Sequence, residues 1–176
     1  MADMYLALTG DHEELLVKGE SLDQDYEEEI EIHEWTWAVD NPAAYGIAET
    51  QATTHAHFHP IIIHKFFDQA SVTLINYCAH GKRIPDATIS CLKHNATDRA
   101  LRVEYLTIWL TDVKVDSVTW SGKGGVEHGI PEQVQLSFQK LEVTYSRQDE
   151  TGNLQDSNSF EFDVPKQKGQ PAKAGK

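Results

Sequence analysis

Hydrophobic and polar residues alternate with a period of two along most of the chain. Such alternation is typical of β-strands that bury one face and expose the other. The stretches that show it are residues 4–8, 28–39, 55–66, 87–92, 103–118, 132–145 and 159–164. The pattern predicts a mainly β protein with mostly antiparallel strands.

Two of these strands change phase part-way along. The stretch 28–39 slips at His33-Glu34, and 132–145 slips after Phe138. A slip of one residue turns the hydrophobic set to the other face, which indicates a β-bulge or a sharp bend. Long, bent strands cannot hide their hydrophobic faces in a flat sheet, so we expect either a barrel or a sandwich of two sheets.

One segment follows a helical period instead. In 71–81, SVTLINYCAHG, apolar residues lie on one face, Ser71 is a candidate N-cap and Gly81 a candidate stop. This is the single helix that the sequence predicts, and we expect it to pack outside the barrel.

The tryptophan strand has two contrasting faces. Trp35 and Trp37 share one face and are expected in the core, which turns Thr36 and Ala38 to the other face. A face of small residues suits either plain solvent surface or the wall of a channel that must stay open. The other residues expected in the core are Leu74, Cys78, Phe138 and Tyr145.

Charge excludes several classes of partner. The chain has 15 Lys and Arg against 28 Asp and Glu, a formal charge of −13. A surface of that sign repels phosphate, so nucleic acid and anionic membranes are poor partners. No apolar run approaches the roughly 20 residues of a membrane span, and the N-terminal stretch lacks the basic region of a secretory signal. We therefore expect a protein that assembles in the cytoplasm.

Length and charge distribution predict one domain followed by a tail. Residues 1–164 suffice for a single barrel with its own core. Residues 165–176 contain four lysines and no acid, which favours a flexible Lys/Gly/Pro-rich tail. The two cysteines, Cys78 and Cys91, lie in apolar-patterned segments and suit buried thiols better than a disulfide, although a pair stays open.

A histidine-rich run raises the question of a metal site. His55, His57 and His59 share one face of a strand, with neighbours about 6.6 Å apart, so two of them could bind one ion but three could not without a bend. No carboxylate lies between Thr50 and Phe67 to complete a zinc site. We expect no bound metal or other cofactor, and read the run as a polar strand face.

No catalytic constellation is present in the sequence. Cys78 lies on the apolar face of the expected helix, where a small buried side chain is more common than a nucleophile. SGKGG at 121–125 lacks the spacing of a phosphate-binding loop and is a candidate hairpin turn. Four acids, Glu27, Glu28, Glu29 and Glu31, could in principle supply a general acid/base pair, but consecutive acids ahead of a strand suit a solvated edge better. We therefore expect a protein that is not an enzyme.

Several separated motifs resemble one protein family. They are YLALTG followed by KGES (18–21), EIEIHEWTWAV, HKFFDQASVTLINYCAHGKRI (64–84), VEYLTIWLTDVKVDSV and PEQVQLSFQKLEVTY. In this order they are similar to the haemolysin-coregulated protein family, Hcp, which forms the tube of bacterial type VI secretion systems. The likeness extends from about Met4 to Val164.

The resemblance implies a function. The resemblance also decides between the two architectures, because it implies a β-barrel of two curled, mostly antiparallel sheets with one short helix packed outside. Hcp proteins are expected to form hexameric rings that stack into a tube, meet sheath and spike proteins, leave the cell when the sheath contracts, and carry small effector proteins in the ring lumen. Thr36 and Ala38 are then the candidate lumen-facing residues, and His55, His57 and His59 candidates for contact with a neighbouring ring. The alternative is a non-catalytic β-barrel binding module with a histidine-based metal site.

Overall fold

A computed structural model describes residues 3–41, 55–95, 101–122, 129–149 and 152–174 of the chain. The elements in chain order are β1 (Met4–Thr9), β2 (Leu15–Val17), β3 (Ile30–Glu31), β4 (Glu34–Thr36), β5 (Val39–Asp40), β6 (His57–Phe58), β7 (Ile61–Phe66), α1 (Gln69–His80), β8 (Arg83–His94), β9 (Arg102–Trp120), β10 (Pro131–Ser137), β11 (Lys140–Gln148), β12 (Leu154–Asp163) and β13 (Lys168–Ala174). All the pairings between these strands are antiparallel, as the alternation predicts.

A barrel closes where the tryptophan strand changes partner. Strands β1, β8, β9, β10, β7 and β4 are neighbours in that order, while β3, just before β4 in the chain, pairs with β1. At the change, the N–H of Ile32 donates to the Met4 carbonyl (3.0 Å) and the N–H of His33 donates to the His64 carbonyl (2.8 Å). The predicted slip at His33 is thus the corner that joins the two edges of the curled sheet.

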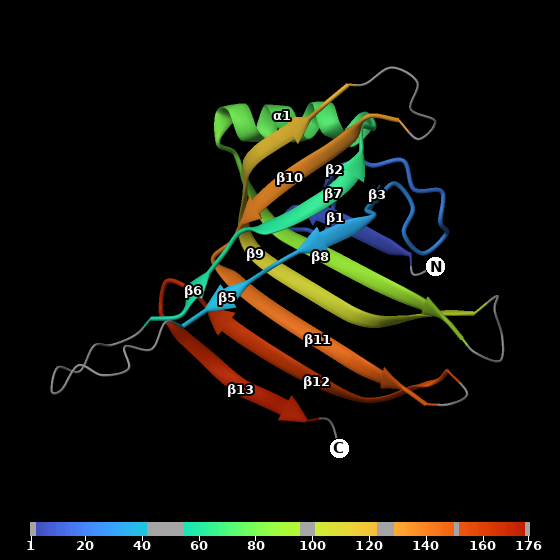
Figure 1. Cartoon of the computed structure of the whole chain (residues 1–176), viewed down its shortest axis with the longest axis vertical. Coiled ribbons are helices and arrows are strands. Elements are labelled where there is room, and N and C mark those ends of the chain that lie inside the picture. Colours follow the sequence, from blue (N-terminus) through green and yellow to red (C-terminus); the bar gives the residue numbers. More distant parts are fainter. Residues whose placement is uncertain (1–2, 42–54, 96–100, 123–128, 150–151, 175–176) are drawn as a thin grey trace, which may run out of the picture.

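The second predicted slip is also a strand break. β10 pairs with the C-terminal part of β9 and β11 with its N-terminal part, so the two behave as one strand that bends at Phe138 and Gln139. β12 and β13 then extend the sheet beyond the barrel (Figure 1).

The C-terminal segment corrects one expectation. We expected a flexible tail from residue 165, but Lys168–Ala174 forms β13 and pairs with β12. The sequence does not predict this strand because its residues are polar and rich in lysine and do not alternate with hydrophobic ones. An edge strand of this kind is held by backbone hydrogen bonds rather than by a buried face.

The helix lies outside the barrel, as expected, but begins earlier (Figure 1). Asp68, not Ser71, is the N-cap, and Ser71 completes a capping box at the third helical position. Gly81 ends the helix in the left-handed conformation at φ 58°, with its N–H donating to the Cys78 carbonyl. The predicted stop is confirmed, whereas the predicted start was wrong.

The barrel interior contains the core. Leu6, Leu8, Ile30, Ile63, Leu74, Ile84, Ile89, Ile108, Leu110, Val113, Val134 and Leu136 are among its buried members. Of the residues expected there, Leu74 is buried, whereas Trp35, Trp37, Cys78 and Phe138 are partly buried and pack against the core. The placement of Tyr145 in the core was wrong, because its side chain is 44% exposed.

Both cysteines are free thiols. Within the described ranges, no helix is long and apolar enough to cross a membrane.

Candidate self-association surface

The hydrophobic face of the sheet extends beyond the core that covers it. One cross-strand row runs through Ile89, Ile108, Val143 and Phe160, on strands β8, β9, β11 and β12. Ile89 is 0% exposed and Ile108 2%, Val143 is partly buried, and Phe160 reaches 36%. The same face therefore changes from buried to open as the sheet leaves the barrel.

The adjacent row repeats this gradient and explains Tyr145. Cys91, Leu106 and Tyr145 are cross-strand neighbours, with exposure rising from 1% at Cys91 to 44% at Tyr145. Alternation correctly predicts that Tyr145 shares the face of the core, but it cannot tell how far the core extends along that face.

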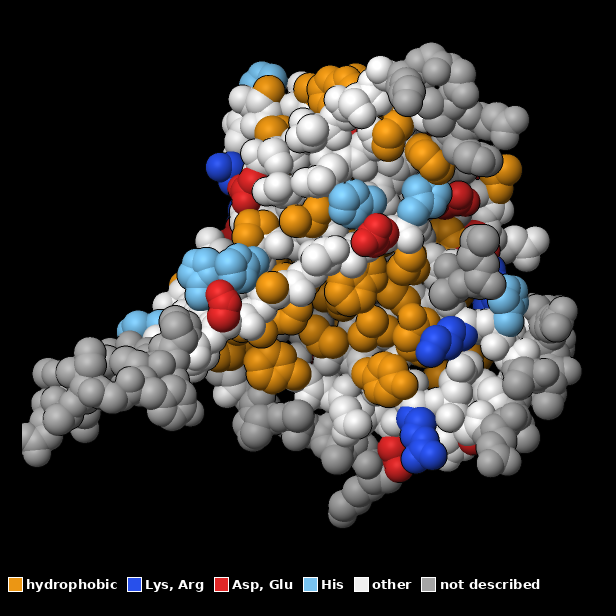
Figure 2. All heavy atoms as spheres, in the orientation of Figure 1, with side chains coloured by type: hydrophobic (Ala, Val, Ile, Leu, Met, Phe, Trp, Pro, Cys, Tyr) orange, Lys and Arg blue, Asp and Glu red, His pale blue; other side chains and the backbone are white. Residues whose placement is uncertain are grey.

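We call the less buried part of this face the open face. It consists of Leu106, Val143, Tyr145, Phe160 and Phe162, of which Tyr145 and Phe160 are exposed and the other three are half-buried. Figure 2 shows hydrophobic side chains gathered in the middle of the view, over the part of the sheet to which β9, β11 and β12 belong. Contiguous exposed hydrophobic patches are rare on monomeric proteins, so this surface is a candidate for contact with another molecule.

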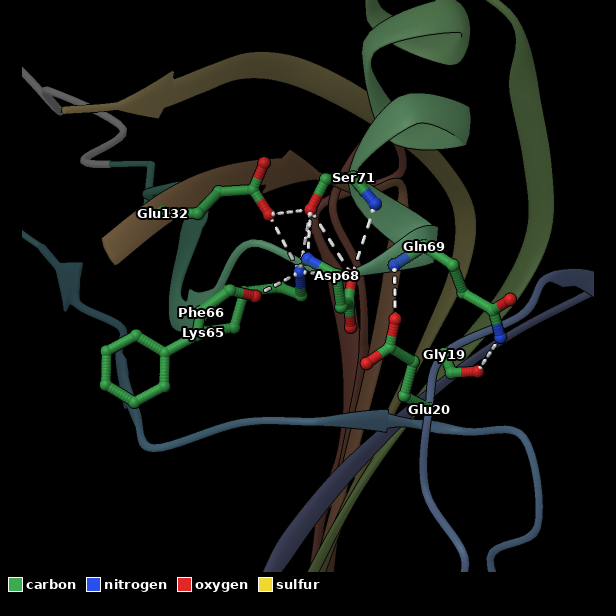
Figure 3. A network of polar contacts seen from close by, with 8 residues as sticks. All are labelled: Gly19, Glu20, Lys65, Phe66, Asp68, Gln69, Ser71 and Glu132. Carbon is green, nitrogen blue, oxygen red and sulfur yellow. Dashed lines mark hydrogen bonds and ion pairs between the residues drawn. The ribbon is translucent and has the colours of Figure 1, made fainter. Parts of the chain in front are cut away.

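A buried polar network holds the helix against the barrel (Figure 3). The Lys65 ammonium is completely buried and lies 2.8 Å from Glu132 Oε2 and 2.6 Å from Asp68 Oδ1. It also donates to the Phe66 carbonyl (2.7 Å) and to Ser71 Oγ (3.0 Å). Lys65 thus links β7, the start of α1 and β10, and pairing offsets the cost of burying its charge.

The KGES segment docks on the same end of the helix. The Gln69 backbone N–H, at the first helical residue, donates to Glu20 Oε1 at 3.0 Å, and the Gln69 side chain donates to the Gly19 carbonyl (Figure 3). A carboxylate is favoured there because the N-terminal N–H groups carry partial positive charge. Gly19 is required because a Cβ would lie 2.2 Å from the Glu29 carbonyl oxygen.

The candidate lumen residues and the histidines lie on the opposite side of the closing strand from the core. Thr36 and Ala38 are exposed, while Trp35, opposite the buried Ile63 in the ladder, faces inward. That Thr36 and Ala38 face a lumen stays a prediction, as do ring contacts of the histidines. His57 and His59 approach Asp40, whereas His55 is exposed outside that group.

Sequence reasoning missed two groups of polar side chains that the structure brings together. It did not identify Lys65, Asp68 and Glu132 as one network, although K-x-x-D-x-x-S was a visible signal. It also gave no sign of Asp40 as a neighbour of the histidines, because the two lie on different strands of a hairpin.

Comparisons with known proteins agree on one family. A family model described as "Type VI secretion system effector, Hcp" matches residues 5–145. "Protein hcp1" of Pseudomonas aeruginosa is 31% identical over 150 residues, which cover 85% of this chain and 86% of that protein.

Solved structures show the same fold. A structure described as a type six secretion system protein aligns with a TM-score of 0.84 at 20% identity, covering 97% of this chain and 100% of that one. Hcp1 from Salmonella typhimurium aligns with a TM-score of 0.72 at 27% identity, covering 96% and 99% respectively. The first supports the fold, and the second links fold and sequence to the same family.

Proposed function

The chain belongs to the Hcp family, the tube proteins of type VI secretion systems, and we propose that its open face is the surface through which copies join into a hexameric ring. The observation that carries this proposal is the gradient of exposure along β8, β9, β11 and β12, from 0% at Ile89 to 36% at Phe160.

A second copy is the occupant that fits the open face best. The surface is hydrophobic and continuous with the core, as in subunits that bury such faces on assembly. A tube protein has many identical copies at hand, so self-association covers the face without another partner. A hexameric ring is consistent with the solved Hcp relatives.

The test compares two substitutions at one position. Tyr145→Asp places a charge on the open face and should convert rings into monomers, whereas Tyr145→Phe keeps the ring and only removes a hydroxyl. Because Tyr145 is 44% exposed, neither change should unfold the chain. Mass by light scattering and negative-stain images give the readout, with circular dichroism as the check on folding.

Two results would contradict the proposal. One is a wild-type chain that stays monomeric from micromolar to millimolar concentration. The other is a folded Tyr145→Asp variant that forms rings of unchanged mass.

We further propose that the ring acts as a non-catalytic carrier. Thr36 and Ala38 line its lumen and contact small effector proteins, while other surfaces meet the sheath and spike of the secretion system. Thr36 and Ala38 are exposed on the face opposite the core, which supports their role in the lumen. Rings assemble in the cytoplasm and leave the cell by the type VI route.

A further inference from the structure

The two-stranded sheet of β5 and β6 brings together three side chains that can bind a metal. Strands β5 and β6 pair antiparallel, with Val39 opposite Phe58 and Asp40 opposite His57. Because paired residues point to the same face, Asp40 and His57 share one side, and His59, two residues after His57, joins them. Figure 2 shows histidine side chains and a carboxylate clustered on this part of the surface.

The distances among the three groups suit one ion. His59 Nε2 lies 2.8 Å from Asp40 Oδ2 and 3.4 Å from His57 Nδ1, and the three ligand atoms all lie within 4.8 Å of one another. Zinc–ligand bonds of about 2.0–2.1 Å in a tetrahedron place neighbouring ligand atoms roughly 3.3 Å apart. The side chains therefore need only small rotations to converge on a single ion.

The backbone around His59 is held in place. Its N–H donates to the Ala38 carbonyl (3.1 Å), and its carbonyl accepts a hydrogen bond from the Trp37 indole N–H (3.1 Å). On the other face of the hairpin Phe58 stacks on Phe162 with ring centroids 4.5 Å apart. The ligand face is thus directed outward by contacts that anchor the opposite face, which lowers the cost of organising the site.

We propose that Asp40, His57 and His59 bind one Zn²⁺ per chain, with a fourth position open to water. The two imidazoles are borderline ligands that favour Zn²⁺ over Mg²⁺ or Ca²⁺, and the carboxylate is a ligand that Zn²⁺ also accepts. The formal charge of −13 adds a general attraction for cations. The carboxylate that the sequence reading looked for near the histidines comes from Asp40, on the partner strand.

The bound ion ties β5 to β6. The ladder between these strands has two residue pairs, and so short a hairpin has little stability of its own. Three ligands from both strands hold it closed, so Zn²⁺ stabilises the folded chain over the unfolded one. This role is independent of whether the open face joins copies into rings.

Calorimetric titration of ZnCl₂ into the full chain, purified without an affinity tag and stripped of metal at pH 7.5, tests the site. A buffer above neutral pH is chosen because an imidazole has to be neutral to bind a metal ion. We expect one Zn²⁺ per chain, and His57→Ala or Asp40→Asn should weaken binding at least about tenfold. His55→Ala is the matched control, because His55 is an exposed histidine outside the ligand group, and it should bind as the wild type does.

Thermal unfolding supplies a second readout. Added Zn²⁺ should raise the melting temperature of the wild type and of His55→Ala, but not of His57→Ala. Circular dichroism confirms that each variant is folded before titration. The proposal is overturned if the wild type binds no stoichiometric Zn²⁺, if folded His57→Ala binds as tightly as wild type, or if His55→Ala weakens binding equally. In any of these cases the group is only a hydrogen-bonded cluster.

Discussion

At the scale of single residues, Glu29 shows how burial raises the pKa of a carboxyl group that the sequence places on a solvated edge. It belongs to a run of glutamates that we read as a solvated edge, but its side chain is partly buried. Burial, followed by the nearby charges of Glu104 and Asp23, raises the pKa of Glu29 from 4.5 to about 7. The folded chain therefore keeps a proton that the unfolded chain releases.

This shift predicts a pH dependence of stability. Between about pH 4.5 and 7 the folded state binds more protons at Glu29 than the unfolded state, so the free energy of unfolding falls as pH rises through this window. Glu29→Gln should flatten that decline and raise the melting temperature at pH 7.5, measured by thermal unfolding from pH 4.5 to 8. Glu27→Gln, at an exposed neighbour, is the control. If the melting temperatures of the two variants depend on pH in the same way, the raised pKa of Glu29 is contradicted.

At the scale of elements, the helix is attached to the barrel by charge as much as by apolar packing. Its buried residues are Ala70, Ser71 and Leu74, a small hydrophobic contribution for a helix of 12 residues. Lys65 and Glu132, each 0% exposed at the side chain, connect its N-terminal end to β7 and β10. This explains why the segment before the helix contains charged residues at positions that become buried.

Removal of the ammonium should therefore be costly. Lys65→Met leaves the Glu132 carboxylate buried without its cation, and we expect a loss of about 3–5 kcal/mol in the free energy of unfolding. The double variant Lys65→Met/Glu132→Leu removes both charges and should recover part of that loss. Urea unfolding of the wild type, both single variants and the double variant measures the coupling between the two residues. If the losses in the free energy of unfolding of the two single variants add up to that of the double variant, Lys65 and Glu132 do not stabilise each other.

At the scale of the whole molecule, the large sheet has more strands than those that form the barrel. β9 contacts β8 on one edge and both β10 and β11 on the other, and β12 and β13 continue from β11 (Figure 1). Beyond the barrel, Phe58 stacks on Phe162, whereas Tyr145 and Phe160 are exposed among the described residues. These exposed side chains are the part of the open face that we propose another copy covers.

If the ring proposal holds, Trp35 of β4 faces the core and Thr36 of the same strand faces the ring lumen. Thr36→Arg should fold and form rings of unchanged mass, because Thr36 is exposed, but should no longer retain a co-expressed effector protein on purification. Thr36→Ser is the matched control and should retain it. If the Thr36→Arg protein does not fold, the two faces of β4 are assigned in reverse. If its rings still retain the effector, Thr36 does not face the lumen.

Much of the fold follows from local patterns in the sequence. The alternation predicts the strands, the slips at His33 and Phe138 mark the two bends, and Gly81 marks the end of the helix. The order of motifs predicts the family, which the comparisons confirm. These features could be predicted because each depends on residues close together in the chain, whose period and turn preferences act before any distant contact forms.

The sequence by itself thus determined a β-barrel with one outer helix and its membership of the Hcp family. Only the tertiary structure decided that Tyr145 is open, that Lys168–Ala174 is a strand, that Lys65 is buried beside Glu132, and that Asp40 meets His57 and His59. The physical reason is strand pairing: which residues become neighbours, and how far the core covers a face, depend on the register of strands distant in the chain.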